Sequence, residues 1–287
     1  RVMGRTSKDK RDIYYRLAKE EGWRARSAYK LLQLDAAFGL LANARRVVDL
    51  CAAPGSWSQV LSSVLSKNAD NGADATHIVA VDLQQMAPLP GVVQLRGDIT
   101  RAETADAITA AMGGRPADVV VCDGAPDVTE LHDLDEAVQG QLLLAALAIA
   151  ARVLAPGGSF VAKVFRGPDA ASILAHVRLF FADVVVAKPA SSRASSLEAF
   201  VVARGYSPPP GFEPATLMAY VAAGLAWASP PDAAHAALVP FVACGDLSGY
   251  DAETTHALPE GYASVPPVQP PLSAPYVAAL RERRCNQ

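Results

Sequence analysis

The chain has 287 residues, of which 51% are hydrophobic and 19% are charged, and its net charge is −3. This composition is typical of a folded soluble protein and argues against a disordered chain. The longest apolar run, Leu142 to Leu154, is too short to cross a bilayer, so we expect no membrane partner. The four cysteines and five histidines are scattered without metal-ligand spacing, which predicts a reduced, intracellular protein with no metal site.

Positive charge is concentrated near the N-terminus. Residues 1–46 contain 12 Lys and Arg against 5 Asp and Glu, a local balance of +7, so the remaining residues carry −10. This asymmetry predicts an N-terminal surface for a polyanion, although a solvated basic helix face gives the same pattern. The expected phosphate contacts are Lys8, Lys10, Arg11, Arg24 and Arg26. We expect the natural chain to start at Met3, and its charged start predicts no signal peptide.

Apolar periodicity predicts helices and strands in alternation. Two helices are expected first, at Asp12–Glu21 and Ser27–Phe38. Strands are then expected at Arg45–Leu50, His77–Leu83, Val92–Leu95, Ala117–Cys122, Ser159–Phe165, Asp183–Ala187 and Glu198–Ala203. The helices between them are expected from the turn after Leu50 to Leu65, and at Arg101–Met112, Leu134–Leu154 and Asp169–Phe180. This order predicts an α/β fold, a mostly parallel sheet with helices on both faces.

The composition changes after Gly205. Thirteen of the 21 prolines lie in residues 206–287, so we expect this Pro-rich C-terminal extension not to continue the sheet, with a short helix at Thr216–Trp227. We also expect Pro156-Gly157-Gly158 to stop the long helix before it. The predicted organisation is a basic N-terminal helical region at residues 1–46, an α/β domain at residues 45–205, and the extension.

The turn after the first strand predicts a ligand-binding corner. Cys51-Ala52-Ala53-Pro54-Gly55 joins a buried strand to a helix, and glycine allows the backbone to approach a ligand closely. Ser56 or Ser58 is expected to cap that helix. A plain strand-to-helix turn is the alternative. The G-x-G-x-x-G pattern is missing, which argues against a nicotinamide-dependent dehydrogenase.

Three carboxylates stand at the carboxyl ends of predicted strands: Asp82, Asp98, which is just past its strand, and Asp123. Because ligands bind along the carboxyl edge of open α/β sheets, these side chains are expected to share a site. Asp82 is placed to accept both ribose hydroxyls of an adenosine, Asp98 to reach an adenine amino group, and Asp123 to approach the reacting end. The alternative for each one alone is a loop cap.

Lys163 lies inside the apolar strand Phe160–Phe165, where a lysine requires a partner. Burial would lower its pKa and allow it to act as a base, whereas neighbouring carboxylates would raise the pKa. A lysine whose charged end reaches solvent is the alternative. Lys30 on the basic helix and Glu198 after the Ser-rich loop are further candidates for the same site.

Four segments together resemble the FtsJ/RrmJ family of S-adenosylmethionine-dependent RNA 2′-O-ribose methyltransferases. They are Arg26-Ser27-Ala28-Tyr29-Lys30-Leu31, Asp49 to Gln59, Val121 to Pro126 and Lys163-Val164-Phe165-Arg166-Gly167. The resemblance implies a Rossmann-like class I methyltransferase domain and a Lys-Asp-Lys-Glu tetrad. The implied catalytic residues are Lys30, Asp123, Lys163 and Glu198. The implied contacts of the cofactor, S-adenosyl-L-methionine, are Gly55, Trp57, Asp82, Asp98 and Asp123. Glu130 departs from the family pattern, which usually has glycine there.

Residues 3–12, 240–250 and 270–276 resemble the eukaryotic cytoplasmic subfamily that methylates the tRNA anticodon loop at its first nucleotide and at the wobble ribose. This implies tRNA as substrate, a cytoplasmic location, and helper proteins that each select a ribose, one of them of WD-repeat type. The alternatives are methylation of ribosomal RNA or of an mRNA cap, and a catalytically silent RNA-binding subunit. The intact tetrad argues against the silent subunit.

Overall fold

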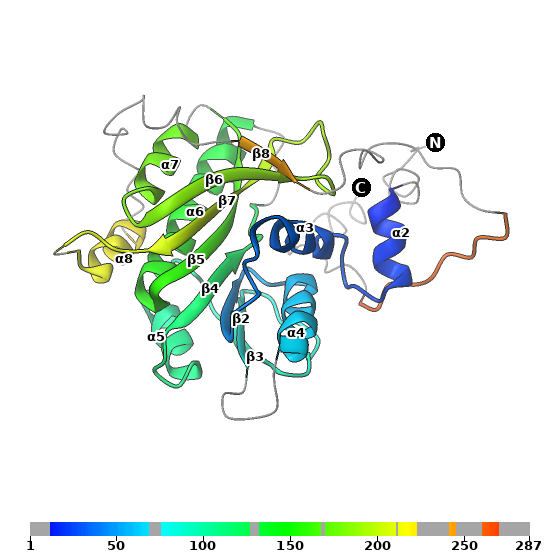
Figure 1. Cartoon of the computed structure of the whole chain (residues 1–287), viewed down its shortest axis with the longest axis horizontal. Helices are drawn as coiled ribbons and strands as arrows, with labels where there is room; N and C mark the ends of the chain where they lie inside the picture. Colours follow the sequence, from blue (N-terminus) through cyan, green and yellow to red (C-terminus); the bar gives the residue numbers. More distant parts are fainter. Residues whose placement is uncertain are drawn as a thin grey trace, which may run out of the picture.

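The computed structural model describes residues 12–68, 76–126, 132–167, 170–210, 212–222, 241–244 and 260–269 (Figure 1). Its described strands form one sheet in the order β3-β2-β1-β4-β5-β7-β6-β8. They are β1 (Arg46–Leu50), β2 (His77–Asp82), β3 (Val92–Arg96), β4 (Ala117–Cys122), β5 (Leu154–Phe165), β6 (Phe181–Pro189), β7 (Glu198–Tyr206) and β8 (Phe241–Cys244). The order reverses at β1, which is where ligands bind in folds of this kind.

Parallel pairing dominates the sheet, as predicted. β1 pairs in parallel with β2 and β4, and β3 and β5 extend the parallel set on either side. β7 runs antiparallel to both β5 and β6. Because β7 is reversed, its first residue, Glu198, lies at the edge where the parallel strands end. The reversal thereby brings Glu198 beside the end of β5.

Helices cover both faces of the sheet. They are α2 (Ile13–Glu20), α3 (Ala28–Phe38), α4 (Ser56–Asn68), α5 (Ala102–Ala111), α6 (His132–Val153), α7 (Ala170–Val177) and α8 (Pro214–Ala222). Side chains of α3 and α4 pack on one face, and side chains of α5, α6, α7 and α8 pack on the other. Figure 1 shows α2 standing to one side of the sheet, joined to it through α3. The predicted α/β architecture is confirmed.

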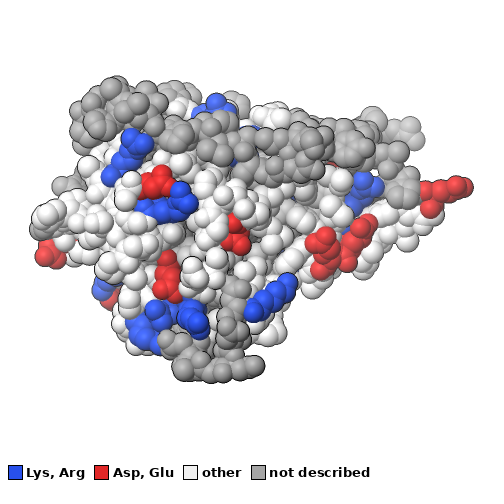
Figure 2. Space-filling view, viewed as in Figure 1, with Lys and Arg blue, Asp and Glu red and all other residues white. Residues whose placement is uncertain are grey.

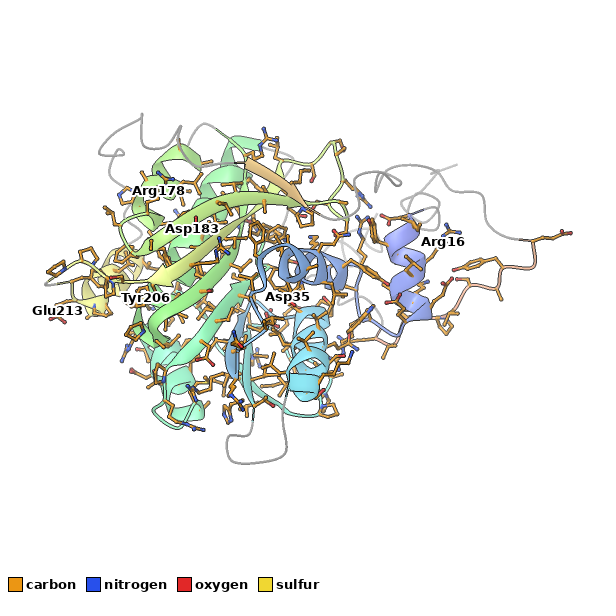
Figure 3. All side chains as sticks on the ribbon, viewed as in Figure 1. Arg16, Asp35, Arg178, Asp183, Tyr206 and Glu213 are labelled. Atoms are coloured by element: carbon orange, nitrogen blue, oxygen red, sulfur yellow. The ribbon has the colours of Figure 1, made fainter. Side chains whose placement is uncertain are left out.

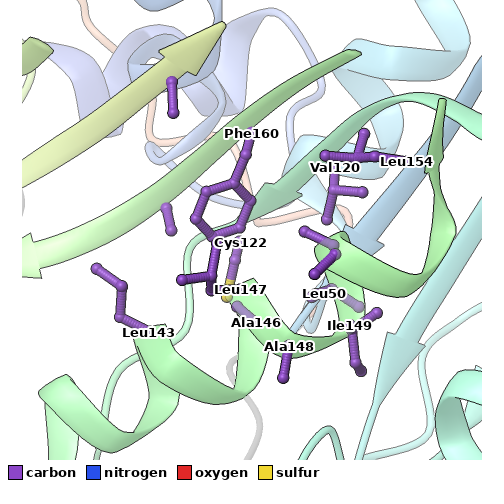
Figure 4. Close-up of a cluster of buried hydrophobic side chains, with 14 of the residues drawn as sticks. Leu50, Val120, Cys122, Leu143, Ala146, Leu147, Ala148, Ile149, Leu154 and Phe160 are labelled. Atoms are coloured by element: carbon purple, nitrogen blue, oxygen red, sulfur yellow. The ribbon is translucent and has the colours of Figure 1, made fainter. Parts of the chain in front are cut away.

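The centre of the core lies beneath α6 (Figure 4). Every residue of this helix from Leu143 to Ala151 is buried, because the helix contacts β4 and β5 on one side and α5, α7 and α8 on the others. A helix that is apolar all round is typical of this fully enclosed position. The Tyr206 hydroxyl, at the end of β7 (Figure 3), donates to the Ala151 carbonyl oxygen at 2.7 Å.

One expectation about helix ends is wrong and another is confirmed. Neither Ser56 nor Ser58 caps α4, because the helix already includes both residues and their hydroxyls bond elsewhere. The expectation that the long helix stops before Pro156-Gly157-Gly158 is confirmed, but this segment is not a turn between helix and strand. Helix α6 ends at Val153 and β5 begins at once, so the segment lies inside β5, where the register against β4 shifts. A bulge of this kind accommodates a proline within a strand.

The C-terminal extension contributes a strand, contrary to expectation. β8 pairs in parallel with β6, from Val186 opposite Phe241 to Pro189 opposite Cys244. Without β8, β6 would be an edge strand with unpaired backbone groups, which another strand readily joins. The helix expected at Thr216–Trp227 is α8, which begins two residues earlier. In the described residues no helix is long and apolar enough to cross a membrane.

Candidate active site

Four charged side chains from distant parts of the chain meet at the carboxyl edge of the sheet. Lys163 Nζ on β5 lies 2.6 Å from Asp123 Oδ1, just after β4, and 3.5 Å from Glu198 Oε2 on β7. Lys30 Nζ on α3 lies 2.8 Å from Glu198 Oε2 and 3.6 Å from Asp123 Oδ1. The structure therefore brings together all four residues of the predicted tetrad, with the two cations alternating with the two carboxylates.

Strand alternation places these side chains on one face of the sheet. Side chains two residues apart on a strand point the same way. Lys163 follows Val161 by two residues and Glu198 precedes Phe200 by two, and both Val161 and Phe200 belong to the apolar cluster beneath α3 and α4. Helix α3 crosses this face and supplies Lys30. Lys163 and Glu198 therefore point toward α3, the helix that carries Lys30.

The carboxylates decide the charge state of Lys163. Burial alone would lower the pKa of its ammonium, but Asp123 and Glu198 outweigh burial and raise the pKa above its ordinary value. Burial alone would raise the pKa of Glu198, yet Lys30 and Lys163 hold that pKa well below its ordinary value. Lys163 is therefore an ammonium at neutral pH, which answers the question that the sequence left open.

Residues outside the tetrad hold Glu198 in place. The buried Ser192 hydroxyl donates to Glu198 Oε1 at 2.7 Å, which leaves Oε2 for the two lysines. Lys188 Nζ donates to the main-chain oxygen of Glu198 at 3.0 Å. The Phe200 ring lies beneath Lys30, whose Nζ is 5.6 Å from the ring centroid. Sequence reasoning did not assign a role to Ser192, and only its place in a Ser-rich loop before Glu198 pointed to it.

Gln139 on α6 joins the two strand ends that carry Asp123 and Lys163. Its buried amide nitrogen donates to the carbonyl oxygens of Gly124 and Lys163, both at 3.1 Å. Strands β4 and β5 separate here, so a side-chain donor replaces the hydrogen bonds of the sheet. Sequence reasoning missed Gln139, because a glutamine in a long helix carries no local signal of such a contact.

Of the two carboxylates predicted to contact adenosine, Asp82 is the last residue of β2 and Asp98 follows β3. Asp82 Oδ2 accepts from Ala53 N at 2.9 Å and Oδ1 accepts from Gln84 N at 2.7 Å. Each carboxylate oxygen has two lone-pair sites, so Asp82 retains capacity for a pair of ribose hydroxyls. Asp98 Oδ1 accepts from both the nitrogen and the hydroxyl of Thr100. Among the described residues these bonds leave Oδ2 of Asp98 for an outside donor. These hydrogen-bond acceptors therefore fit an adenosine-containing cofactor, whose ribose hydroxyls and adenine amino group are donors.

The turn after β1 contains a backbone conformation that requires glycine. Gly55 has φ +102°, a region that side chains other than glycine rarely adopt. Trp57 is only 2% exposed, and its indole Nε1 donates to the Ser27 carbonyl oxygen at 2.8 Å. Its side chain is thus part of the core. The assignment of Trp57 and Gly55 to cofactor binding stays a prediction.

A buried carboxylate that sequence reasoning did not assign lies beneath the same turn. Asp49 on β1 accepts from the Ser58 hydroxyl at 2.5 Å. Burial raises the pKa of Asp49 to about 7, against the opposing effect of the Ser58 hydrogen bond. Asp49 therefore couples the first turn of α4 to the central strand of the sheet.

Two of the predicted phosphate contacts have other partners. Arg24 is buried and donates to main-chain carbonyls, so the prediction that it contacts phosphate is wrong. Arg26 pairs with the buried Asp12 and donates to the Ser191 carbonyl oxygen, which joins α2 to the loop before β7. Figure 2 shows charged side chains scattered among uncharged ones over the described part of one face.

Several predictions fall outside the described residues. They concern Lys8, Lys10, Arg11, Glu130 and the motifs near the C-terminus, apart from the short strand β8.

Comparison with known proteins identifies relatives along the whole chain. The model of the FtsJ-like methyltransferase family matches residues 23–206. The human tRNA (cytidine(32)/guanosine(34)-2′-O)-methyltransferase is 56% identical over 294 residues, which span 99% of this chain and 87% of the human protein. The Schizosaccharomyces pombe enzyme of the same name is 54% identical over 97% of each chain.

A solved structure supports the fold. A ribosomal RNA methyltransferase from Plasmodium falciparum superposes with a TM-score of 0.58 at 22% identity, over 65% of this chain and 100% of its own. The predicted Rossmann-like fold, methyl transfer and S-adenosyl-L-methionine dependence are thereby confirmed at the level of the family. The chain belongs to the FtsJ-like methyltransferase family.

Proposed function

We propose that this chain transfers a methyl group from S-adenosyl-L-methionine to the ribose 2′-hydroxyls of cytidine 32 and guanosine 34 in tRNA. Relatives that match nearly the whole chain are named for this reaction. The observation that carries the methyl-transfer chemistry is the cluster of Lys30, Asp123, Lys163 and Glu198, in which each lysine Nζ lies 2.6 to 3.6 Å from an oxygen of each carboxylate. A silent RNA-binding subunit has no need of this arrangement.

The proposed roles follow from charge and position. When bound, the cofactor supplies a methyl group on a sulfonium, which is already reactive toward an oxygen nucleophile. The chain's own residues then have to align the 2′-oxygen, and alignment alone can account for much of the rate. Lys163, an ammonium in the free protein, donates a hydrogen bond to the 2′-oxygen as that oxygen reacts. Asp123 and Glu198 orient Lys163, and the hydroxyl proton passes to a carboxylate or to water.

The remaining predicted site residues have supporting roles in this proposal. Lys30 holds the target ribose or its phosphate. Asp82 accepts from the cofactor ribose, Asp98 from its adenine, and the main chain around Gly55 and Trp57 approaches the rest of the cofactor.

The test uses tRNA that lacks the proposed acceptor atoms. Methyl transfer to a tRNA with cytidine 32 and guanosine 34 is compared with transfer to the same tRNA carrying 2′-deoxyribose at one or both positions. We expect each single deoxy substitution to remove one methyl group and the double substitution to abolish transfer. Unchanged transfer to the doubly substituted tRNA, or a preference for a ribosomal RNA fragment, would contradict the proposal.

We also propose that the chain acts in the cytoplasm with helper proteins, one of WD-repeat type, which select the ribose. In this proposal residues 1–46 contact the tRNA and residues 206–287 contact a helper. The pairing of β8 with β6 supports this proposal, because it attaches residues 241–244 of the extension to the edge of the sheet. A chain ending after residue 240 is expected to bind S-adenosylhomocysteine but lose its helper in co-purification. Normal helper binding by this shortened chain would contradict the assignment of the extension.

A further inference from the structure

Arg24 is a buried cation that has no carboxylate partner among the described residues. The residue is 9% exposed. Its guanidinium instead donates to two main-chain carbonyls, from Nη1 to Pro54 O and from Nη2 to Pro88 O, each at 3.0 Å. Burying an arginine is unfavourable unless its donors are satisfied. The two carbonyls satisfy Nη1 and Nη2 and are thereby held in specific positions, whereas Nε is buried without a hydrogen-bond partner among the described residues.

The two carbonyls belong to the two segments on either side of Asp82. Pro54 lies in the turn after β1, and Pro88 lies in the segment between β2 and β3. Ala53, next to Pro54, donates its N–H to Asp82 Oδ2 at 2.9 Å. The guanidinium therefore joins both segments. Because Ala53 is next to Pro54 and donates to Asp82, the guanidinium also helps to orient the Asp82 carboxylate.

Arg24 is itself held firmly. Its backbone nitrogen donates to Gln59 Oε1 at 2.7 Å, and Gln59 Nε2 donates to the Gly22 carbonyl oxygen at 3.1 Å. Gln59 lies in the first turns of α4, so the chain just before α3 is tied to the helix that follows the turn. The turn also packs directly on the guanidinium, because a Cβ built on Gly55 would lie 2.6 Å from Arg24 Nη1.

We infer that Arg24 is a positioning residue for S-adenosyl-L-methionine: it sets the shape of the turn at Gly55 and its distance from the segment after Asp82. The inference depends on the cofactor of the family and not on the proposed tRNA substrate. It also replaces the prediction that Arg24 contacts phosphate, since both terminal nitrogens of the guanidinium are engaged within the protein.

The experiment measures cofactor binding and RNA binding separately on the full chain. Calorimetry with S-adenosylhomocysteine reports the first, and tRNA binding at several salt concentrations reports the second. Arg24→Met is expected to weaken S-adenosylhomocysteine binding about tenfold, with tRNA affinity and its salt slope unchanged. Arg24→Lys is expected to lie between wild type and Arg24→Met, because one ammonium can reach only one of the two carbonyls at full strength.

Arg204→Met is the control for the loss of an arginine far from the cofactor, although the Arg204 side chain is more exposed than that of Arg24. Arg204 also uses two nitrogens, both on Asp183, but it lies near the other end of β7, away from the carboxyl edge. It is expected to leave the affinity for S-adenosylhomocysteine unchanged.

Two results would overturn the inference. One is wild-type affinity for S-adenosylhomocysteine in folded Arg24→Met. The other is weaker tRNA binding with a reduced salt slope and intact cofactor binding, which would make Arg24 a phosphate contact. If Arg24→Met does not fold, Arg24→Lys carries the same test, and wild-type cofactor affinity in that variant overturns the inference. Failure of the tRNA assay alone bears on the proposed function and leaves the cofactor result intact.

Discussion

The two faces of the sheet are built differently. On the face covered by α6, a continuous run of side chains from Leu143 to Ala151 is buried in an apolar cluster. On the face covered by α3 and α4, apolar side chains are mixed with buried polar ones. The buried polar side chains around this second face include Arg24, Asp49, Ser56, Ser58 and Lys163.

The difference shows that directional polar contacts are concentrated on the face of α3 and α4, with Gln139 on α6 as an exception that reaches the site from the other face. Apolar packing is non-directional, so the α6 face can stabilise the fold without fixing any one atom. A buried polar group needs a partner at a defined distance and angle. On the second face those partners are the turn after β1 and the tetrad. Each polar contact there therefore fixes the position of a site residue, and this division can be tested by substitutions on each face.

The largest effect is expected from Lys163→Ala on the polar face. Turnover should fall by about two to four orders of magnitude, the usual range for loss of a positioned proton-transfer or charge-stabilising group. S-adenosylhomocysteine affinity should be nearly unchanged, because other residues contact the cofactor. Lys163→Arg should not restore turnover, since guanidinium differs in shape. Single-turnover methyl transfer to tRNA, with the exposed Lys67→Ala as control, is the measurement. Near-normal rates would contradict the tetrad assignment.

Leu147→Ala on the α6 face should affect stability alone. Removing this fully buried side chain is expected to lower the free energy of unfolding by about 2–5 kcal/mol. Turnover per folded molecule should not change. Leu61→Ala, a matched buried leucine on α4, should destabilise similarly and also weaken S-adenosylhomocysteine binding. Denaturant titration and calorimetry give both quantities. If Leu147→Ala and Leu61→Ala bound S-adenosylhomocysteine with equal affinity, the proposed difference in role between the two faces would be contradicted.

Ser192→Ala tests positioning without a change of charge. Losing the hydrogen bond to Glu198 Oε1 should lower turnover about tenfold, as expected for about 1–1.5 kcal/mol. The thermal midpoint and the affinity for S-adenosylhomocysteine should change little. Ser196→Ala is the control on the same loop, because the Ser196 hydroxyl bonds to the Arg193 carbonyl oxygen and not to the tetrad. Equal turnover in the two variants would mean that Ser192 does not position Glu198.

The smallest effect is a pH dependence at Asp49. Burial raises the pKa of Asp49 from 3.8 to about 7, so the carboxyl stays protonated in the folded protein where it would ionise in the unfolded chain. Its contribution to stability is fully present below the unfolded pKa and is lost as pH rises through about 7. The side chain of the Asp49→Asn variant cannot ionise. As pH rises from about 5 to 8, the thermal midpoint of the variant should therefore rise by a few degrees relative to that of the wild type. A difference in thermal midpoint that stays constant across this pH range would contradict the raised pKa of Asp49.

Much of the fold follows from local patterns. The alternation of apolar helices and strands predicted the sheet domain, and the element bounds differ from the prediction mainly at element ends. The tetrad was predicted from the resemblance to the FtsJ/RrmJ family. Lys30, Asp123 and Lys163 lie in the segments that carry the resemblance, whereas Glu198 lies outside them, at the start of the strand after the Ser-rich loop. Side-chain alternation along a strand is a local property, so the face that Lys163 occupies is already implied by Val161 two residues earlier.

Tertiary structure decided the rest, because those features depend on atoms far apart in the chain. The contact between Lys30 and Glu198 joins residues 168 positions apart, and the charge state of Lys163 depends on distances to two carboxylates that no local pattern encodes. Arg24 looked like a surface cation, yet the fold buries it against Pro54 and Pro88. Sequence determines which groups a chain possesses. Only packing determines which of them lose water and must find partners within the protein.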